Sequence, residues 1–119
     1  GLHKKETFFY EDINFVKNNI KKHNLKNTYV FKAYFPNDVK VKINKIKLCH
    51  IDVNTFYDTQ KIFKKIKKKI VKGGMIIFDD FGIWGVNGIK KFIYKIEKKY
   101  NNQFIFIKNY MGQCILIKK

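Results

Sequence analysis

Three aspartates stand where short apolar segments of the chain end. Asp52 follows the apolar segment 46–51, and Asp79 and Asp80 follow the apolar segment 75–78. If these segments are neighbouring parallel strands of an open α/β sheet, their carboxyl ends meet at one crevice. Three carboxylates that lie together repel one another unless a cation or a proton intervenes. The residue types and their spacing therefore predict a site for a hard divalent metal ion with oxygen ligands.

His50 lies two residues before the first of these aspartates. Alternation along a strand points the side chains of His50 and Asp52 to the same face of the sheet. This position suits a base or a metal ligand. The sequence favours a packed or hydrogen-bonded strand histidine and leaves the other role open.

A helix is expected to join the two acidic strand ends. Residues 58–71 place apolar side chains on one face and lysines on the other, with the spacing of an amphipathic helix. Thr55 or Asp58 could cap its start, and the glycine pair 73–74 could end it in a left-handed conformation. The continuous apolar run 75–78 predicts a strand that is buried on both faces.

The remaining segments add elements on both sides of this unit. Apolar residues at helical spacing predict helices over residues 11–24 and 87–100. β-branched and aromatic residues predict a strand over residues 28–35, and residues 103–108 and 113–118 predict two strands joined by a short loop. This order predicts a mostly parallel sheet with right-handed crossovers and an antiparallel pair at its end.

The chain is strongly basic, with a formal net charge of +17. All of its 26 basic side chains are lysines, and arginine, the residue that makes bidentate contacts to guanine and phosphate, is absent. Lys, Ile and Asn are overused together, which indicates codon base composition rather than selection for a charged face. We therefore expect a solvated lysine surface and no nucleic-acid partner. The alternative that stays open is a non-catalytic basic α/β module that binds nucleic acid or another polyanion.

Length and cysteine usage indicate one intracellular domain. The 119 residues suffice for one domain or part of one, and no apolar run approaches the roughly 18 residues that span a bilayer. A signal peptide requires an apolar segment after its basic start, and no such segment follows the first five residues. Cys49 and Cys114 lie in strand-like segments and suit buried small hydrophobes rather than a disulfide framework. We therefore expect a cytoplasmic protein without a membrane segment.

Several short motifs occur along the chain in a fixed order. They are Phe-Pro at 35–36, Ile-Asp-Val-Asn at 51–54, Thr59, Lys-Gly-Gly at 72–74, Ile-Phe-Asp-Asp-Phe-Gly at 77–82, Gly-Ile-Lys-Lys-Phe at 88–92 and Gly-Gln at 112–113. Together they resemble the C-terminal half of the TylF/macrocin-type O-methyltransferases, over residues 11–119. These class I enzymes depend on S-adenosylmethionine and typically methylate sugar hydroxyls. Each motif alone is common, and their order carries the resemblance.

The resemblance implies a Rossmann-like class I methyltransferase fold, with three layers and a mostly parallel sheet that has an antiparallel C-terminal strand. It also implies that Asp52, Asp79 and Asp80 are ligands of a divalent ion, usually Mg²⁺. The ion would hold a sugar-like or other small-molecule acceptor and acidify its hydroxyl, so that the oxygen attacks the sulfonium methyl in line. Ala33 and Tyr34, at the end of the first predicted strand, match positions at which the superfamily contacts the adenine of the cofactor.

Two departures from the family pattern concern catalysis and the cofactor. The family commonly has a second aspartate, proposed as the general base, two residues after the first ligand, and this chain has Asn54 there. An amide cannot take the proton; Asn54 could instead orient the substrate or cap the helix, while the metal or another base activates the hydroxyl. In addition, the strands that carry the glycine-rich turn and the ribose-binding acid are absent.

We therefore expect residues 1–119 to form a single partial domain, the C-terminal portion of a methyltransferase. Such a chain alone should bind S-adenosylmethionine poorly and be inactive. An unpaired strand edge invites further pairing, so we expect the missing N-terminal half or a second copy of the chain as a partner. The sequence does not identify the methyl acceptor.

Overall fold

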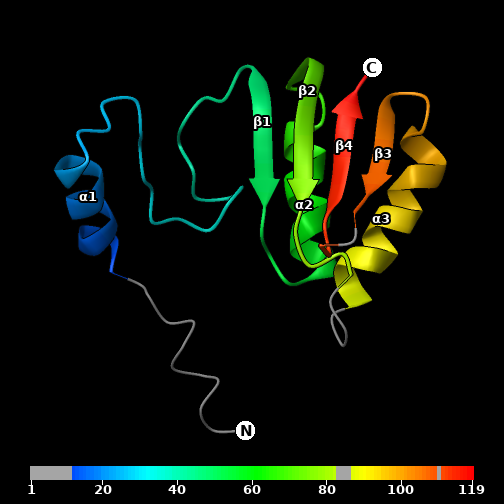
Figure 1. Ribbon diagram of the computed structural model, residues 1–119, viewed down its shortest axis with the longest axis horizontal. Coiled ribbons are helices and arrows are strands. Elements are labelled where there is room, and N and C mark those ends of the chain that lie inside the picture. Colours follow the sequence, from blue (N-terminus) through cyan, green and yellow to red (C-terminus); the bar gives the residue numbers. More distant parts are fainter. Residues whose placement is uncertain (1–11, 83–86, 110) are drawn as a thin grey trace, which may run out of the picture. The chain divides into compact units, whose positions relative to one another are not determined.

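The computed structural model describes residues 12–82, 87–109 and 111–119. Its elements follow in the order α1 (Ile13–Lys22), β1 (Ile46–Ile51), α2 (Phe56–Ile66), β2 (Ile70–Phe78), α3 (Asn87–Tyr100), β3 (Phe104–Lys108) and β4 (Cys114–Lys118) (Figure 1). They belong to two compact units, residues 1–39 and 40–119, and each unit is described by itself. No helix within the described ranges is both long and apolar enough to cross a membrane.

The first unit contains the helix α1. The carboxylate of Asp12 caps its start by accepting a hydrogen bond from the backbone N–H of Asn14 at 2.9 Å. Lys21 and Lys22 occupy the last turn, where positive charge suits the helix dipole. The helix predicted over residues 11–24 is therefore confirmed within the described part, which begins at residue 12.

The strand predicted over residues 28–35 is wrong. These residues adopt no regular secondary structure, and Tyr29 and Phe31 are exposed. β-branched and aromatic residues favour a strand when a neighbouring strand supplies backbone hydrogen bonds and a packing surface. Among residues 12–39 the structure has a helix and no strand that could provide them.

The second unit is built on a four-stranded mixed sheet with the order β1-β2-β4-β3. β1 pairs with β2 in parallel, and β4 runs antiparallel to both β2 and β3. Three strands therefore share one direction, and the C-terminal strand opposes them. This confirms an α/β fold with a mixed sheet, and it places β4 between β2 and β3.

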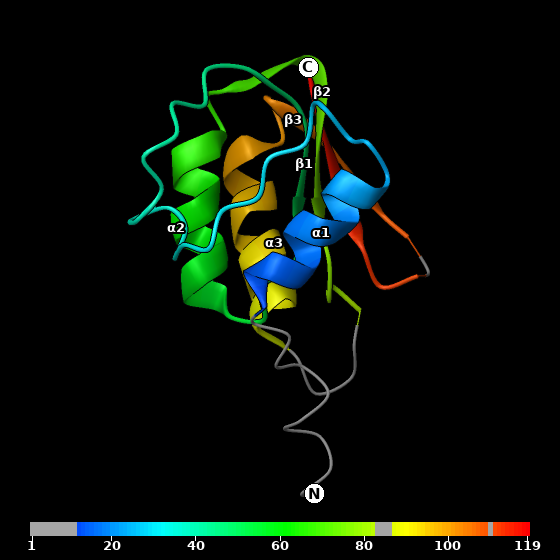
Figure 2. The ribbon, with the colours of Figure 1, turned by 90° about the vertical axis from the view of Figure 1, so that its left-hand side faces the viewer.

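Helices α2 and α3 lie on the same face of this sheet (Figures 1 and 2). Their apolar stripes meet the inward side chains of the strands, and this contact forms the core. The helical residues buried there are Thr59, Ile62, Phe63, Ile66, Ile89, Phe92, Ile93 and Ile96. The described residues of this unit thus form two layers, and the third layer that we expected is not among them.

The glycine pair 73–74 lies inside β2 rather than at the end of a helix, so the predicted helix cap is wrong. Helix α2 ends at Ile66, and Ile70 already pairs with Ile46 of β1. The next pair is Leu48 with Met75, so β2 carries extra residues in a bulge. Gly73 adopts a φ of +72°, and a Cβ on Gly74 would approach the Val71 carbonyl oxygen to 2.8 Å. The two glycines therefore shape the bulge.

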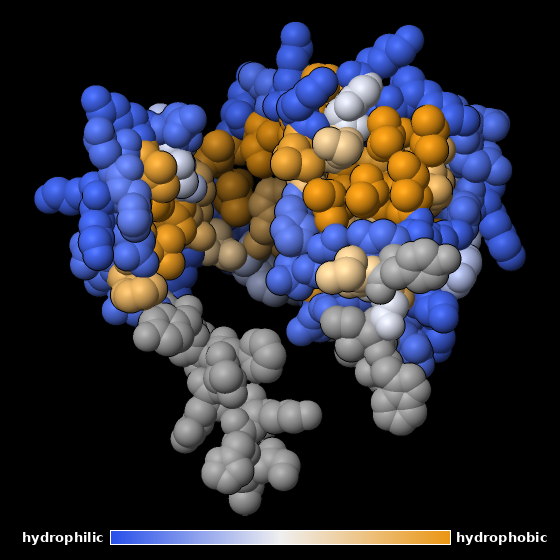
Figure 3. Space-filling model, in the orientation of Figure 1, coloured by the Kyte–Doolittle hydropathy of each residue, from blue (hydrophilic) through white to orange (hydrophobic). Residues whose placement is uncertain are grey.

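The second face of the sheet is apolar and accessible within this unit (Figure 3). Along β2, Ile76 and Phe78 are fully buried, whereas Met75 is 37% exposed, so the prediction of a strand buried on both faces is wrong for Met75. We call this surface the outer face. Its side chains are those of Leu48, His50, Met75, Ile77, Ile105, Ile107, Ile115 and Ile117.

The two cysteines are free thiols in the sheet. Cys114 is fully buried in the core, and burial raises the pKa of its thiol to about 12. Cys49 is half-buried, and burial raises its pKa as well. Both residues therefore match the expectation of small hydrophobic side chains rather than members of a disulfide framework.

Candidate functional site

The ends of β1 and β2 bring the predicted acidic residues to one edge of the sheet. Ile51 and Phe78 are register partners, and the backbone N–H of Asp79 donates to the Ile51 carbonyl oxygen at 3.0 Å. Asp52 and Asp79 therefore follow paired residues of adjacent parallel strands. The expectation that the two acidic strand ends are neighbours is confirmed.

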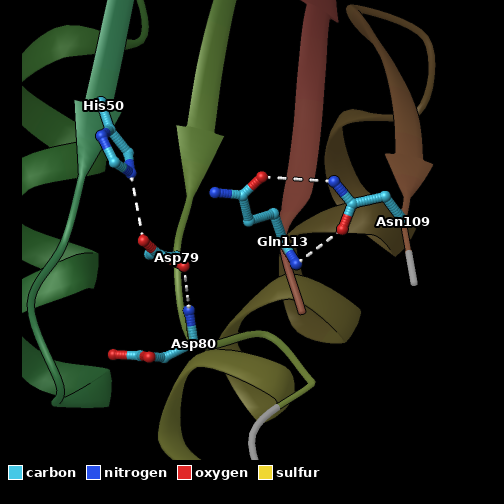
Figure 4. A network of polar contacts seen from close by, with 5 residues as sticks. All are labelled: His50, Asp79, Asp80, Asn109 and Gln113. Carbon is cyan, nitrogen blue, oxygen red and sulfur yellow. Dashed lines mark hydrogen bonds and ion pairs between the residues drawn. The ribbon is translucent and has the colours of Figure 1, made fainter. Parts of the chain in front are cut away.

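Asp79 is the most constrained of the three carboxylates. Its Oδ1 accepts a hydrogen bond from the backbone N–H of Asp80 at 3.1 Å, and its Oδ2 lies 3.4 Å from His50 Nε2 (Figure 4). The His50 side chain is 50% exposed and lies on the outer face of β1. Oδ1 thus has a backbone donor and Oδ2 lies at ion-pair distance from the imidazole, and each oxygen retains a lone pair for another ligand.

Asp80 occupies an unusual backbone conformation, with a φ of +60°. Aspartate and asparagine tolerate this left-handed region better than most residues. Burial, and then the negative charges of Asp52 and Asp79, raise the pKa of the Asp80 carboxyl above its ordinary value of 3.8. Asp52 and Asp79 are therefore close enough to Asp80 to act on its carboxyl electrostatically.

In their present conformations the three carboxylates are not grouped closely enough to bind one metal ion. Asp52 is exposed beyond the end of β1, and Figure 4 shows the Asp80 side chain extending away from Gln113. Among the described residues, no group of three or more His, Cys, Asp or Glu side chains comes together tightly enough to hold a metal ion. Shared coordination of one ion would require side-chain rotation, which the exposure of Asp52 permits.

The start of α2 settles one of the roles that the sequence left open for Asn54. Thr55 is the N-cap: its Oγ1 accepts a hydrogen bond from the backbone N–H of Asp58 at 3.1 Å and donates to Asp58 Oδ2 at 2.6 Å. Asn54 is exposed and is not the capping residue. Its predicted role in orienting a substrate stays a prediction.

A polar network in the β3–β4 turn was not predicted from the sequence. Asn109 Oδ1 accepts hydrogen bonds from the backbone N–H groups of Met111 and Gln113, and Asn109 Nδ2 donates to Gln113 Oε1 at 3.2 Å (Figure 4). The carbonyl oxygen of Gly112 in turn accepts the backbone N–H of Phe81 at 2.8 Å. The turn therefore anchors the loop that follows Asp80. An asparagine shortly before a glycine between two strands is the signal that could have indicated it.

This anchoring depends on two glycines. A Cβ on Gly82 would lie 3.1 Å from Gly112 Cα, and Gly112 itself has a φ of +80°. The close approach of the two backbones lets the Gly112 carbonyl oxygen reach the N–H of Phe81. Residues 79–82 are thus held on the β4 side by Gly112 and on the β1 side by Ile51.

Ala33 and Tyr34, the predicted adenine contacts, lie in the first unit. Both are exposed, in a segment without regular secondary structure. The strand that was expected to position them is absent from the described residues, so their role stays a prediction.

Asp80→Asn is expected to remove a pH-dependent destabilisation. Because the pKa of Asp80 is raised above 3.8 in the folded chain, the folded state binds this proton more tightly than the unfolded state. The resulting stabilisation is present below pH 3.8 and is lost as the pH rises through the raised pKa. The wild-type free energy of unfolding should therefore fall, relative to that of the variant, as acidic buffers approach neutrality. Urea unfolding across this range measures the difference, and a difference that does not change with pH would contradict it.

The chain is similar to a known protein family and to solved structures. The model of the family described as macrocin O-methyltransferase (TylF) matches residues 2–111. No protein in a collection of curated proteins matches the chain. Fourteen chains among the solved structures match it.

One of these solved structures is described as the structure of the O-methyltransferase NovP. It is 16% identical to this chain, with a TM-score of 0.79, and the match covers 99% of this chain and 49% of the NovP chain. At this identity the likeness shows a shared fold. The chain spans about half the length of the NovP structure.

Proposed function

Because the chain belongs to the TylF macrocin O-methyltransferase family, we propose that it contributes the metal-binding edge of an S-adenosylmethionine-dependent O-methyltransferase. The acceptor would be a hydroxyl group of a sugar-like or other small molecule. The family membership supports the reaction class, and the arrangement at the ends of β1 and β2 supports the location of the site.

The observation that carries this proposal is the placement of Asp52 and Asp79 directly after paired residues of two adjacent parallel strands, with Asp80 next along the chain. Burial, and then the charges of Asp52 and Asp79, raise the pKa of the Asp80 carboxyl. A bound cation would relieve the repulsion between these carboxylates in their ionised form. The donor set consists of carboxylate oxygens, which Mg²⁺ prefers. The residues present therefore fit a hard divalent ion in charge and in chemistry.

Asp52, Asp79 and Asp80 would hold the ion. When bound, it supplies Lewis acidity that orients the acceptor and lowers the pKa of its hydroxyl. Asn54 is the residue at the position of the family's proposed base, and its amide is too weakly basic to take a proton at neutral pH. We therefore propose that Asn54 orients the acceptor through hydrogen bonds and does not remove its proton.

The cofactor is expected to bind the 119-residue chain weakly or not at all. The chain resembles the C-terminal half of its family, whereas the glycine-rich turn that holds the cofactor in class I methyltransferases belongs to the N-terminal half. Titration calorimetry with S-adenosylmethionine should show no micromolar binding, with or without Mg²⁺. Micromolar binding would contradict this expectation and would place a complete cofactor site within these residues.

The remaining cofactor contacts would come from further polypeptide or from a second copy of the chain. The chain spans about half of the NovP structure, and β1 is an edge strand of the described sheet. An edge strand presents backbone donors and acceptors that can pair with another strand. Addition of strands at this edge would extend the sheet beside the carboxylates.

The alternative function, binding of a polyanion through the basic surface, makes a different prediction about salt. Affinity that comes from lysine–phosphate contacts falls steeply as the salt concentration rises. Stabilisation by Mg²⁺ at fixed ionic strength is instead specific to a cation site. The two experiments together separate the methyltransferase site from a polyanion surface.

A further inference from the structure

We propose that His50 is a positioning residue for Asp79, one that holds this carboxylate ready for the divalent cation. The inference rests on the proposed metal site. It concerns a residue of β1 that need not contact the cation. His50 Nε2 lies 3.4 Å from Asp79 Oδ2, while Asp79 Oδ1 accepts the backbone N–H of Asp80 at 3.1 Å.

The register of β1 against β2 brings the side chains of His50 and Asp79 together on one face of the sheet. His50 is the register partner of Ile77, and Asp79 lies two residues further along β2 on the same face. Gln113 precedes Cys114, the register partner of Phe78, so it follows the same face on β4. The polar row His50, Asp79 and Gln113 thus borders the apolar rows of the outer face (Figure 4).

Asp52, two residues further along the chain, is the other carboxylate expected on the face of His50, and the ion-pair contact of the imidazole is with Asp79. Leu48 on β1 and Ile77 on β2 are apolar and offer no hydrogen-bonding side-chain atom. Within the described part of the chain, the polar side chain that contacts the ring is Asp79.

A carboxylate that is held at both oxygens has lost most of its rotational freedom before a ligand arrives. Asp79 approaches this condition, because its Oδ1 accepts the backbone N–H of Asp80 at 3.1 Å and its Oδ2 lies 3.4 Å from the imidazole Nε2, within ion-pair distance. Each oxygen still has a second lone-pair site that can face a cation. Such outer-shell partners typically contribute about 10–100-fold to metal affinity.

A matched set of variants tests this role by metal affinity. In titration calorimetry with Mn²⁺ or Mg²⁺, His50→Leu should raise Kd by about 10–100-fold. His50→Gln should stay closer to the wild type, because its amide can place a donor near the position of Nε2. Leu48→Ala, which changes the same face of β1 without touching Asp79, should leave Kd unchanged. If the leucine variant does not fold, His50→Ala takes its place with the same expected loss.

The outcomes separate this inference from the proposed function. If the wild type binds the cation and His50→Leu binds it equally well, the positioning role is wrong and the metal site stands. If His50→Leu lowers the melting temperature of the metal-free protein but leaves Kd unchanged, His50 is only structural and the inference is again overturned. If the wild type binds neither cation, both the metal site and the role of His50 are refuted.

Discussion

Phe63→Ala is expected to lower the free energy of unfolding by about 3–5 kcal/mol, the usual cost of removing a buried phenylalanine. Phe63 is 2% exposed. Its ring centroid lies 5.4 Å from that of Tyr100, 5.6 Å from that of Phe92 and 6.1 Å from that of Phe104. Because the ring joins α2 to both α3 and β3, its loss leaves a cavity that no single neighbour can fill. Chemical denaturation measures the change.

The total stability of a small domain is about 5–15 kcal/mol, so this single substitution should remove a large share of it. Phe31→Ala provides a matched control, since the same chemical change is made at a side chain that is 56% exposed. The control should change the stability by at most about 0.5 kcal/mol. Equal effects of the two substitutions would show that the ring cluster around Phe63 is not the centre of the core.

Asp80→Asn is expected to abolish stabilisation by Mg²⁺. A ligand that binds only the folded state, at about 100 times its Kd, stabilises by about 2.7 kcal/mol. Asparagine preserves the left-handed backbone conformation that Asp80 adopts at φ +60°, and it removes the negative charge. Alanine would add backbone strain to the loss of charge. Thermal unfolding with and without Mg²⁺, at fixed ionic strength, measures the effect.

Asp38→Asn is the control for the change in net charge. Asp38 is exposed and lies in the first unit, so its variant should keep the full Mg²⁺ response. A wild-type chain that Mg²⁺ does not stabilise would remove the basis for the metal site. An unchanged response in Asp80→Asn would exclude Asp80 from the ligands and leave the other two carboxylates to be tested in the same way.

The sequence predicted strand β1 and helix α3 with the bounds that the structure shows. The bounds of helix α3 follow from apolar residues that recur at the spacing of one buried face. Those of strand β1 follow from the short, mostly apolar segment 46–51. The adjacency of Asp52 and Asp79 followed from the rule for the carboxyl ends of parallel strands. These features depend on local pattern and on the topology of the sheet.

The features that the sequence did not predict depend on contacts between distant segments. Residues 28–35 have the composition of a strand, but a strand also needs a partner. The glycine pair 73–74 follows a helical pattern, yet its conformation is set by the register of β2 against β1. The link from Asn109 to Gln113 forms only after the β3–β4 turn closes, and the rotation of each carboxylate is not encoded in spacing.

The apolar outer face favours association between copies of the chain, whereas the net charge of +17 opposes it. Like charges keep molecules apart over about 10 Å at 0.1 M salt, and this range shrinks as salt is added. Contact between two aliphatic surfaces gains free energy from released water and is not screened in this way. Ionic strength therefore sets which of the two forces governs colloidal stability, and dilute buffer is the condition that favours dispersed molecules.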